Sequence, residues 1–555
     1  MAAGPPSKGK SADPFPHEIV QVISTTPTVA QVNDETRLES LGYEQELKRN
    51  FSMFETGVLP SIASTIWYNL PYGSSVAMTW GWLLAGSLIL FVGLAMGDLA
   101  SSMPTSGGLY FWTHRLGPPR YRNLLAWMVG YNSLLGNIAA TSSLAWGAAG
   151  IIFAAGSISD SSFSPTTAQT FGLYVGILLF VGALCAYGTT ALGRLQTPSV
   201  ILNVLLILVT IIGLPIARRH NLNPASYTFG GFDNLTGWNN GFAFILSFLA
   251  PVWTICSFDS AVSISEEATN AATAVPWAIV GAIASATISG FAILVVLALT
   301  MGQDVMAIYN SDIGQPLAFI YLQAFGRDGS LVIWSFMCVA QIMMTASLVL
   351  PASRQAFAFA RDGALPFSTY FYSVNKHTQT PVRTVWLIIG GAIPLGAFAF
   401  ADDAAINAIF TLAVIGPYVA YAIPIACRVF SGDKIFVPGP WFLGRFSKPI
   451  AIVALVWMVF ACIIFCFPAD VAPTAATMNY AVVVAAAVWA FALGYWFIPR
   501  IGGRTFFTGP RTHDGNMLEY DDSDGPSDEL AMQRSEEFPL DTKKSSMARN
   551  AEVIL

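Results

Sequence analysis

The residues best placed to do chemistry lie in FAFILSFLAPVWTICSFDSAVSISEEATNA, residues 242–271. The segment begins apolar, Pro251 interrupts it, and Asp259 follows at a depth where a membrane helix would be surrounded by hydrocarbon. An ionisable side chain there costs a few kcal/mol, so it normally faces a cavity or a partner. Asp259 is therefore a candidate site residue, either as a proton carrier or as a structural acceptor for hydroxyl groups of a neighbouring helix.

A second interrupted segment, TGVLPSIASTIWYNL, spans residues 56–70 and contains Pro60. It is too short for an ordinary membrane helix, which needs about 20 apolar residues. Two broken helices at corresponding places in two related halves of a chain mark the binding site of many secondary transporters. The physical reason is that an unwound turn frees N–H and C=O groups in mid-membrane, and the N-terminus of a half-helix attracts an anion. The alternative is that Pro60 and Pro251 merely kink ordinary helices.

The composition predicts a multi-pass membrane protein. Of the 555 residues, 54% are hydrophobic and 11% are charged, whereas a soluble protein has about 25% charged residues. With the short segment near 51–70, the apolar runs predict about twelve spans. The others fall near 77–102, 124–156, 167–188, 197–217, 241–265, 276–301, 329–352, 384–401, 405–427, 449–468 and 479–498.

The distribution of positive charge predicts the orientation. With a cytoplasmic N-terminus, all of the 27 Lys and Arg residues except Arg218, Arg219 and Arg327 fall on the cytoplasmic side. The positive-inside rule therefore predicts that both termini are cytoplasmic. The polar ends, 1–45 and the acidic 501–555, are expected to be disordered tails. The plasma membrane is the expected location, with the vacuolar membrane as the alternative.

Several classes of function are disfavoured. We find no HExxH motif, no serine-centred elbow and no Cys/His set, so neither an enzyme nor a metal or cofactor site is predicted. The net charge is −6, and the cations flank apolar runs, so no nucleic-acid partner is expected. The expected partners are the lipid bilayer, a small solute and protons.

Three motifs resemble a known family. They are GDLASSMPTSGGLYFWTHRLGPPRYRNLLAWMVGY from Gly97, FDSAVSISEEATNA from Phe258, and SRQAFAFARDGALPF from Ser353 with TPVRTVW at Thr380. In order and spacing they are similar to the amino acid–polyamine–organocation superfamily, specifically its fungal branch of amino acid, GABA and choline permeases. The resemblance covers about residues 40–500.

The resemblance implies an all-α polytopic membrane protein with the leucine-transporter-like fold. That fold is a five-plus-five inverted repeat with two further helices and with broken helices 1 and 6. It implies a transporter domain over 46–500, with repeat one at about 51–217, repeat two at about 241–427, and the extra helices at 449–498.

The resemblance also implies a substrate site at the two breaks. Gly57, Val58, Leu59, Pro60 and Ser61 would form the unwound middle of helix one and offer N–H groups to a substrate carboxylate. In arginine/agmatine antiporters of the superfamily, a Trp and an acidic residue have the same spacing as Trp253 and Asp259 in helix six. Trp253 would therefore form an aromatic wall of the site, or it would simply be a packing residue. Thr254, Ile255, Cys256 and Ser257 would supply carbonyl groups, and Phe258 would gate the site or pack. The hydroxyls of Thr345 and Ser347 could serve sodium coupling or only join helices.

Glu266 and Glu267 follow span six in a loop without Lys or Arg. We expect them either to be solvated or to form an intracellular gate. Their basic partners would come from Arg115, Arg120, Arg122, Arg354 and Arg361.

The leading functional prediction is a secondary permease for a small amine-bearing solute, most simply an amino acid such as GABA, with proton coupling. Choline is the first alternative, for which Trp253, Trp146, Tyr131 and Tyr68 could build an aromatic cage. A nutrient sensor that binds without transport is the second. Its support is a departure from the family, because Asn50-Phe51-Ser52 runs almost directly into Glu55-Thr56-Gly57 and about two helical turns, or about 10 Å, are missing.

Overall fold

The computed structural model describes residues 58–510 except positions 377, 379, 402, 433–434, 475–477 and 501. In this part of the chain the regular structure is helical, apart from one isolated β-bridge between Tyr72 and Asn234. The helical elements are α2 (Val58–Thr65), η1 (Ile66–Tyr68), α3 (Ser74–Val76), η2 (Ala77–Gly81), α4 (Trp82–Ser102), α5 (Gly108–Leu116), α6 (Arg122–Ser159), α7 (Thr167–Tyr187), α8 (Thr189–Leu208), η3 (Val209–Gly213), α9 (Leu214–Ala217), α10 (Ala225–Gly230), α11 (Asn240–Leu246), α12 (Leu249–Thr254), α13 (Ser260–Ser263), η4 (Ser265–Glu267), α14 (Ala271–Thr300), α15 (Val305–Tyr309), α16 (Pro316–Arg361), α17 (Ser368–Phe371), α18 (Val382–Gly396), η5 (Ala397–Phe400), α19 (Asp403–Phe430), η7 (Gly444–Phe446), α20 (Ser447–Ile464), α21 (Ala481–Phe497) and α22 (Gly503–Phe506).

Within the described residues, nine helical stretches are long and apolar enough to cross a membrane. Two shorter apolar helices, 240–254 and α21, stand where further spans were predicted. The described part of the first predicted span is α2 with η1. The predicted all-helical polytopic fold is therefore confirmed.

Helices that occupy the same position in the order of the two halves of the chain pack against each other. α4 packs on α14, α6 on α16 and α7 on α18, as expected if the halves are related. In each pair an aromatic side chain donates a hydrogen bond to a backbone carbonyl of the other helix, which joins the two without a charged group. These bonds run from Trp82 to Thr287 (3.1 Å), from Trp334 to Ile151 (2.8 Å) and from Tyr174 to Ala392 (2.5 Å).

Glycines allow two of the closest helix contacts. A methyl group at Gly290 of α14 would lie 2.2 Å from the ring of Trp82 on α4. One at Gly416 of α19 would lie 3.0 Å from the Cα of Gly136 on α6. Because lipid gives helices no hydrophobic reason to associate, small residues that let backbones approach are a main source of contact energy.

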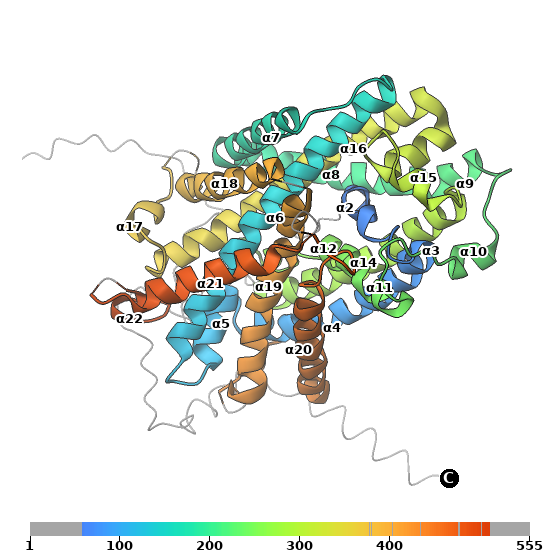
Figure 1. Ribbon diagram of the computed structural model, residues 1–555. Coiled ribbons are helices and arrows are strands. Elements are labelled where there is room, and N and C mark those ends of the chain that lie inside the picture. The colour runs from blue at the N-terminus through green and yellow to red at the C-terminus, as the bar shows by residue number, and fades with distance from the viewer. Residues whose placement is uncertain are drawn as a thin grey trace, which may run out of the picture.

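The bundle has two ends, which we name after the short helices that lie there. α5 connects α4 to α6 at one end, and α15 connects α14 to α16 at the other; we call these the α5 end and the α15 end. The short helices α2 and α12 lie near the middle of the bundle (Figure 1) and contact each other. Both of the predicted broken spans are therefore central.

Part of the predicted C-terminal tail, 501–555, is packed at the α5 end. After α22, Phe507 is only 2% exposed and meets the indole of Trp127 edge to face at 5.4 Å between ring centroids. Gly509, with φ +105°, lies against the imidazole of His114 on α5. Aromatic burial thus holds this stretch, whereas the tail 1–45 and residues 511–555 lie outside the described residues.

Candidate functional site

Helix six is interrupted between α12 and α13. Residues Ile255–Asp259 form no regular helix, and Ser257 has φ +61°, a left-handed conformation that non-glycine residues rarely adopt. Pro251 does not lie at this interruption. It is the third residue of α12, where its missing N–H costs no intrahelical hydrogen bond. The break therefore begins one helical turn after the proline that drew attention to it.

Helix one differs from its prediction. Val58 to Ser61, expected to be part of an unwound turn, are helical and belong to α2. Gly57, the remaining residue of the predicted turn, lies outside the described residues. Pro60 therefore lies within a helix, and its neighbours Leu59 and Ser61 are buried there.

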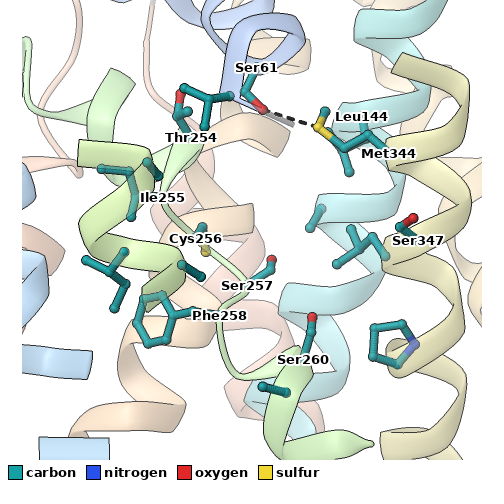
Figure 2. Close-up of a pocket in the computed structure, with 18 of the residues that line it drawn as sticks. Ser61, Leu144, Thr254, Ile255, Cys256, Ser257, Phe258, Ser260, Met344 and Ser347 are labelled. Atoms are coloured by element: carbon teal, nitrogen blue, oxygen red, sulfur yellow. Dashed lines mark hydrogen bonds between the residues drawn. The ribbon is translucent and has the colours of Figure 1, made fainter. Parts of the chain in front are cut away.

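A cavity of about 210 Å³ lies between these two segments. Figure 2 shows Ser61 of α2 pointing toward Met344 of α16, with Ser257 and Ser260 on the side of helix six. The Ser61 hydroxyl donates to the Met344 sulfur at 3.3 Å. Among the described residues that line the cavity, none is Asp, Glu, Lys, Arg or His.

Most of the predicted substrate-binding residues line this cavity. They are Val58, Ser61, Trp253, Thr254, Ile255, Cys256, Ser257 and Phe258. Leu59 and Pro60 are buried on α2 but do not line it. The sequence did not predict the other lining residues. Helix six adds Ser260, Ala261 and Ile264, and other helices contribute Ala140, Leu144, Gln196, Ala278, Ala282, Ile283, Ala286, Met344, Leu348, Leu350, Pro351 and Ala413.

One sequence signal could have identified some of these lining residues. Ala278, Ala282 and Ala286 recur every four residues and so share one face of α14. Small residues at this spacing are common wherever membrane helices touch, so the pattern alone does not distinguish a cavity from a contact. Among the polar lining residues, Gln196 accepts a hydrogen bond of 3.5 Å through its side-chain oxygen from the Ser347 hydroxyl. Thr345 instead donates within α16 and does not line the cavity.

Aromatic side chains separate the cavity from the α15 end. Trp253 lines the cavity and stacks on Phe410 of α19, which in turn contacts Tyr68. The Tyr68 hydroxyl donates to the Asn407 side chain at 3.0 Å. We call Trp253, Phe410 and Tyr68 the aromatic layer. A hydrogen bond of 3.2 Å between the hydroxyls of Thr65 and Thr254 ties α2 to α12 beside it.

The other residues considered for an aromatic cage lie elsewhere. Tyr131 donates to the carbonyl of Ala364 and packs on Trp127 toward the α5 end. Trp146 packs on Tyr174 of α7. Neither lines the cavity, nor does Tyr68. The structure therefore brings Trp253 and Phe258 to the cavity without the other three members of the predicted cage.

Comparison with known proteins identifies the family. A family model described as amino acid permease matches residues 51–488. A GABA-specific permease of Saccharomyces cerevisiae is 35% identical over 87% of this chain and 86% of its own length. An uncharacterised amino-acid permease of Schizosaccharomyces pombe is 37% identical, over 86% and 88%, and amino-acid permease 2 of Neurospora crassa is 32% identical, over 92% and 93%. This chain belongs to the amino acid permease family.

The permease is thus an integral membrane protein of the fungal amino acid permease branch of the APC superfamily, and its relatives are transporters rather than enzymes. In this setting Asp259 is a buried acid next to the main cavity. It is 7% exposed, and its Oδ1 accepts a hydrogen bond of 2.7 Å from the Tyr421 hydroxyl of α19. Asp259 does not line the main cavity but a smaller one, on the side of the α5 end.

Glu266 is the centre of a polar network at the α5 end. Its Oε1 accepts from the backbone N–H of Ser106 at 2.9 Å and from the Ser106 hydroxyl at 2.7 Å. Its Oε2 lies 3.5 Å from Arg361 of α16. Beside it, the Tyr110 hydroxyl donates to Asp362 at 2.7 Å. These five residues, which we call the α5-end network, join the loop before α5 to helix six and to the end of α16.

Arg361, one of the five arginines considered, is therefore a basic partner of Glu266. Arg115, named with Glu266 and Glu267 as an intracellular gate, is half-buried on α5. Glu267 ends the short turn η4. Because the side chain of Glu266 is 1% exposed and that of Arg361 is 8% exposed, the pair is a buried one, unlike the solvated surface pair that was the alternative.

Proposed function

We propose that this permease carries a zwitterionic amino acid such as GABA by alternating access, coupled to protons. The observation that carries the proposal is a cavity between helices one and six that no charged side chain lines. A solute with a net charge would be buried there without a counter-charge, which costs several kcal/mol. A zwitterion brings its own. The 35% identity to a GABA-specific permease supports the same substrate class.

The two ends of the substrate have matching groups. Val58 and Ser61 of α2 line the cavity, and in this proposal the backbone N–H groups at residues 57–61 would hold the carboxylate. At the opposite wall, the irregular backbone at Ile255 to Ser257 would offer carbonyl groups to the ammonium. The face of Trp253 would add a cation–π contact of about 0.5–2 kcal/mol.

The same lining gives less support to choline. Choline has no carboxylate for the N-terminus of α2, and its quaternary ammonium has no N–H to donate to carbonyl groups. Its recognition would depend on an aromatic cage. Of the predicted cage residues only Trp253 lines the cavity, which Phe258 also borders.

Alternating access would use the two closures that flank the cavity. The aromatic layer would open and close the α15 end. The α5-end network, with Glu267 and Arg115 as further members, would form the gate at the opposite end. We assign the moving parts to two repeats, at about 51–217 and 241–427. The packing of α4 on α14 and of α6 on α16, which pairs corresponding helices of the two repeats, supports this assignment.

The positive-inside pattern supports placing the α5 end in the cytoplasm, because Arg115, Arg354 and Arg361 all lie there. We place the permease in the plasma membrane. Asp259 is the proton carrier in this proposal, because it is buried beside the cavity and accepts a hydrogen bond from the neutral hydroxyl of Tyr421.

The proposal is tested by uptake of labelled GABA and labelled choline, side by side, in yeast that lacks its own permeases. Each assay is run with and without a proton uncoupler, after the protein has been shown to reach the plasma membrane. Trp253→Ala is compared with Trp277→Ala, whose side chain is 63% exposed on α14 and does not line the cavity.

Saturable GABA uptake that the uncoupler and Trp253→Ala both abolish, with Trp277→Ala unchanged, is the expected result. Saturable choline uptake in place of GABA uptake would replace the substrate class. GABA binding without any flux would instead indicate the sensor.

A further inference from the structure

A second cavity lies between the break in helix six and the α5-end network. Its volume is about 10 Å³, and the lining residues with polar side-chain groups are Ser106, Tyr110, Ser133, Asp259, Ser263 and Gln355. Gln355, on α16, is 4% exposed. Neither its Nε2 nor its Oε1 has a hydrogen-bond partner among the described residues. Since an unpaired buried polar group costs about 1–3 kcal/mol, this amide points to a ligand that both donates and accepts.

A water molecule fits these requirements better than a cation. A buried water needs a cavity of roughly 10–15 Å³ and two to four polar partners, which this cavity supplies. Water accepts from the Nε2 of Gln355 and donates to its Oε1 or to a carboxylate. A sodium ion would satisfy Oε1 but would leave the two N–H groups of the amide unpaired.

The cavity joins two acids that are not in contact. Asp259 lines it from helix six, and Ser106 lines it from the loop before α5. The hydroxyl of Ser106 already donates to Glu266 at 2.7 Å. We infer that Gln355 holds a water that relays a proton from Asp259, through the Ser106 hydroxyl, to Glu266. The inference rests on the proton coupling in the proposed function.

The transfer balances at each atom. The carboxyl of Asp259 gives its proton to the water, the water gives one of its own to Oγ of Ser106, and Ser106 gives its original proton to Oε1 of Glu266. Asp259 ends as a carboxylate and Glu266 as a neutral acid. The water and Ser106 keep their composition, so no other reactant is needed.

The arrival of the proton also acts on the gate. A neutral Glu266 no longer attracts Arg361, which lies 3.5 Å away, and its protonated oxygen is a poorer acceptor for Ser106. The titratable groups that face the two acids include Tyr421 of α19 and Cys256 beside Asp259 and Arg361 beside Glu266. Of these, only Arg361 carries a full charge. Protonation of Glu266 removes the attraction to Arg361, so the α5-end network weakens when the proton from Asp259 reaches Glu266.

The test uses the purified full-length permease in liposomes that contain a pH-sensitive dye. GABA-driven proton entry, labelled GABA uptake, GABA exchange and the Kd for GABA are measured together. Gln355→Leu removes both polar atoms at similar volume. The matched control is Gln341→Leu, which changes a fully buried glutamine on the same helix that does not line the small cavity.

Gln355→Leu is expected to keep the Kd and the exchange rate while its GABA-driven proton entry falls about tenfold or more, because a positioned proton-transfer group contributes roughly 100- to 10,000-fold. Gln341→Leu should keep the wild-type ratio of protons to GABA. Ser106→Ala, which retains the backbone N–H bond to Glu266, should reproduce the loss.

An unchanged proton-to-GABA ratio in Gln355→Leu or Ser106→Ala would overturn the relay and leave proton coupling standing. Wild-type GABA transport without proton entry would overturn both. A wild-type requirement for sodium in place of a proton gradient would likewise overturn the relay and assign the cavity to a cation.

Discussion

Trp253 and Phe410 stack with their ring centroids 5.4 Å apart and their planes inclined by 30°. One ring belongs to the broken sixth span and lines the cavity, and the other belongs to α19 and is 7% exposed. The stack therefore joins the broken sixth span to α19 beside the cavity.

Phe410→Ala should weaken GABA binding by about two- to tenfold, since an aromatic pair contributes about 0.5–1.5 kcal/mol beyond the area it buries. The loss would arise because the aromatic layer no longer closes over the cavity. The Kd is measured on purified protein against Phe398→Ala, which truncates a side chain on η5 that is 41% exposed. Equal affinities in the two variants would show that Phe410 only packs.

Glu266→Gln should open the α5 end more often, because it keeps the shape of the side chain but removes its attraction to Arg361. A loss of about 1.4 kcal/mol would raise the open fraction about tenfold. Cys256, which lines the cavity, is a native reporter whose labelling by a membrane-impermeant thiol reagent can be followed by mass spectrometry. Asp328→Asn, at an exposed position near the other end of α16, is the control. An unaltered labelling rate in Glu266→Gln would contradict a gating role.

Gly290→Ala should destabilise the bundle by about 1–3 kcal/mol, the usual cost of overpacking. The added methyl group would lie 2.2 Å from the Trp82 ring, so α4 and α14 would have to separate. In Gly176→Ala on α7, the new methyl group meets nothing within 4 Å, and this variant should be neutral or stabilising. The measurement is the thermal midpoint of each variant in detergent. Equal midpoints would show that the contact between α4 and α14 accommodates the added methyl group.

The docked C-terminal segment should be sensitive to acid. Burial, with the nearby charge of Arg122, lowers the pKa of His114 from its ordinary value of 6.5 to about 4. Between these two values the unfolded chain takes up a proton that the folded chain does not. The free energy of unfolding should therefore fall as the pH decreases, by about 1.4 kcal/mol per pH unit at most.

The check is the thermal midpoint of wild type and His114→Gln at about pH 7.5 and about pH 5. The wild type should lose more stability on acidification than the variant, which has no titrating group there. The same acid sensitivity in both proteins would assign it to other residues.

The sequence predicted the parts of the site that depend on chain-local signals. The apolar runs located the spans, and the small and polar residues after Trp253 located the break in helix six. Pro60 and Pro251 were weaker guides. Pro251 lies in the first turn of α12, where proline is tolerated, and Pro60 lies within α2. A proline therefore marks the start of a half-helix as readily as its interruption.

The residues that the sequence did not predict are set by tertiary packing. Gln196, Met344 and Pro351 come to the cavity from helices distant in the chain, and nothing in their local pattern differs from ordinary helix contacts. The pairing of Glu266 with Arg361 was one of several allowed by charge alone. The orphan amide of Gln355 is visible only when its surroundings are known, since buried glutamines are usually satisfied.

Competition against labelled GABA uptake would show whether the cavity accepts a zwitterionic amino acid. Unlabelled GABA, a neutral α-amino acid, arginine, glutamate and choline are compared as competitors at equal concentrations in the permease-deficient yeast that expresses this chain. GABA is expected to compete, whereas arginine, glutamate and choline, which carry a net charge, are not. Saturable uptake displaced equally well by choline or arginine would rule out the proposed substrate class, because the uncharged cavity would then be accepting a net cation.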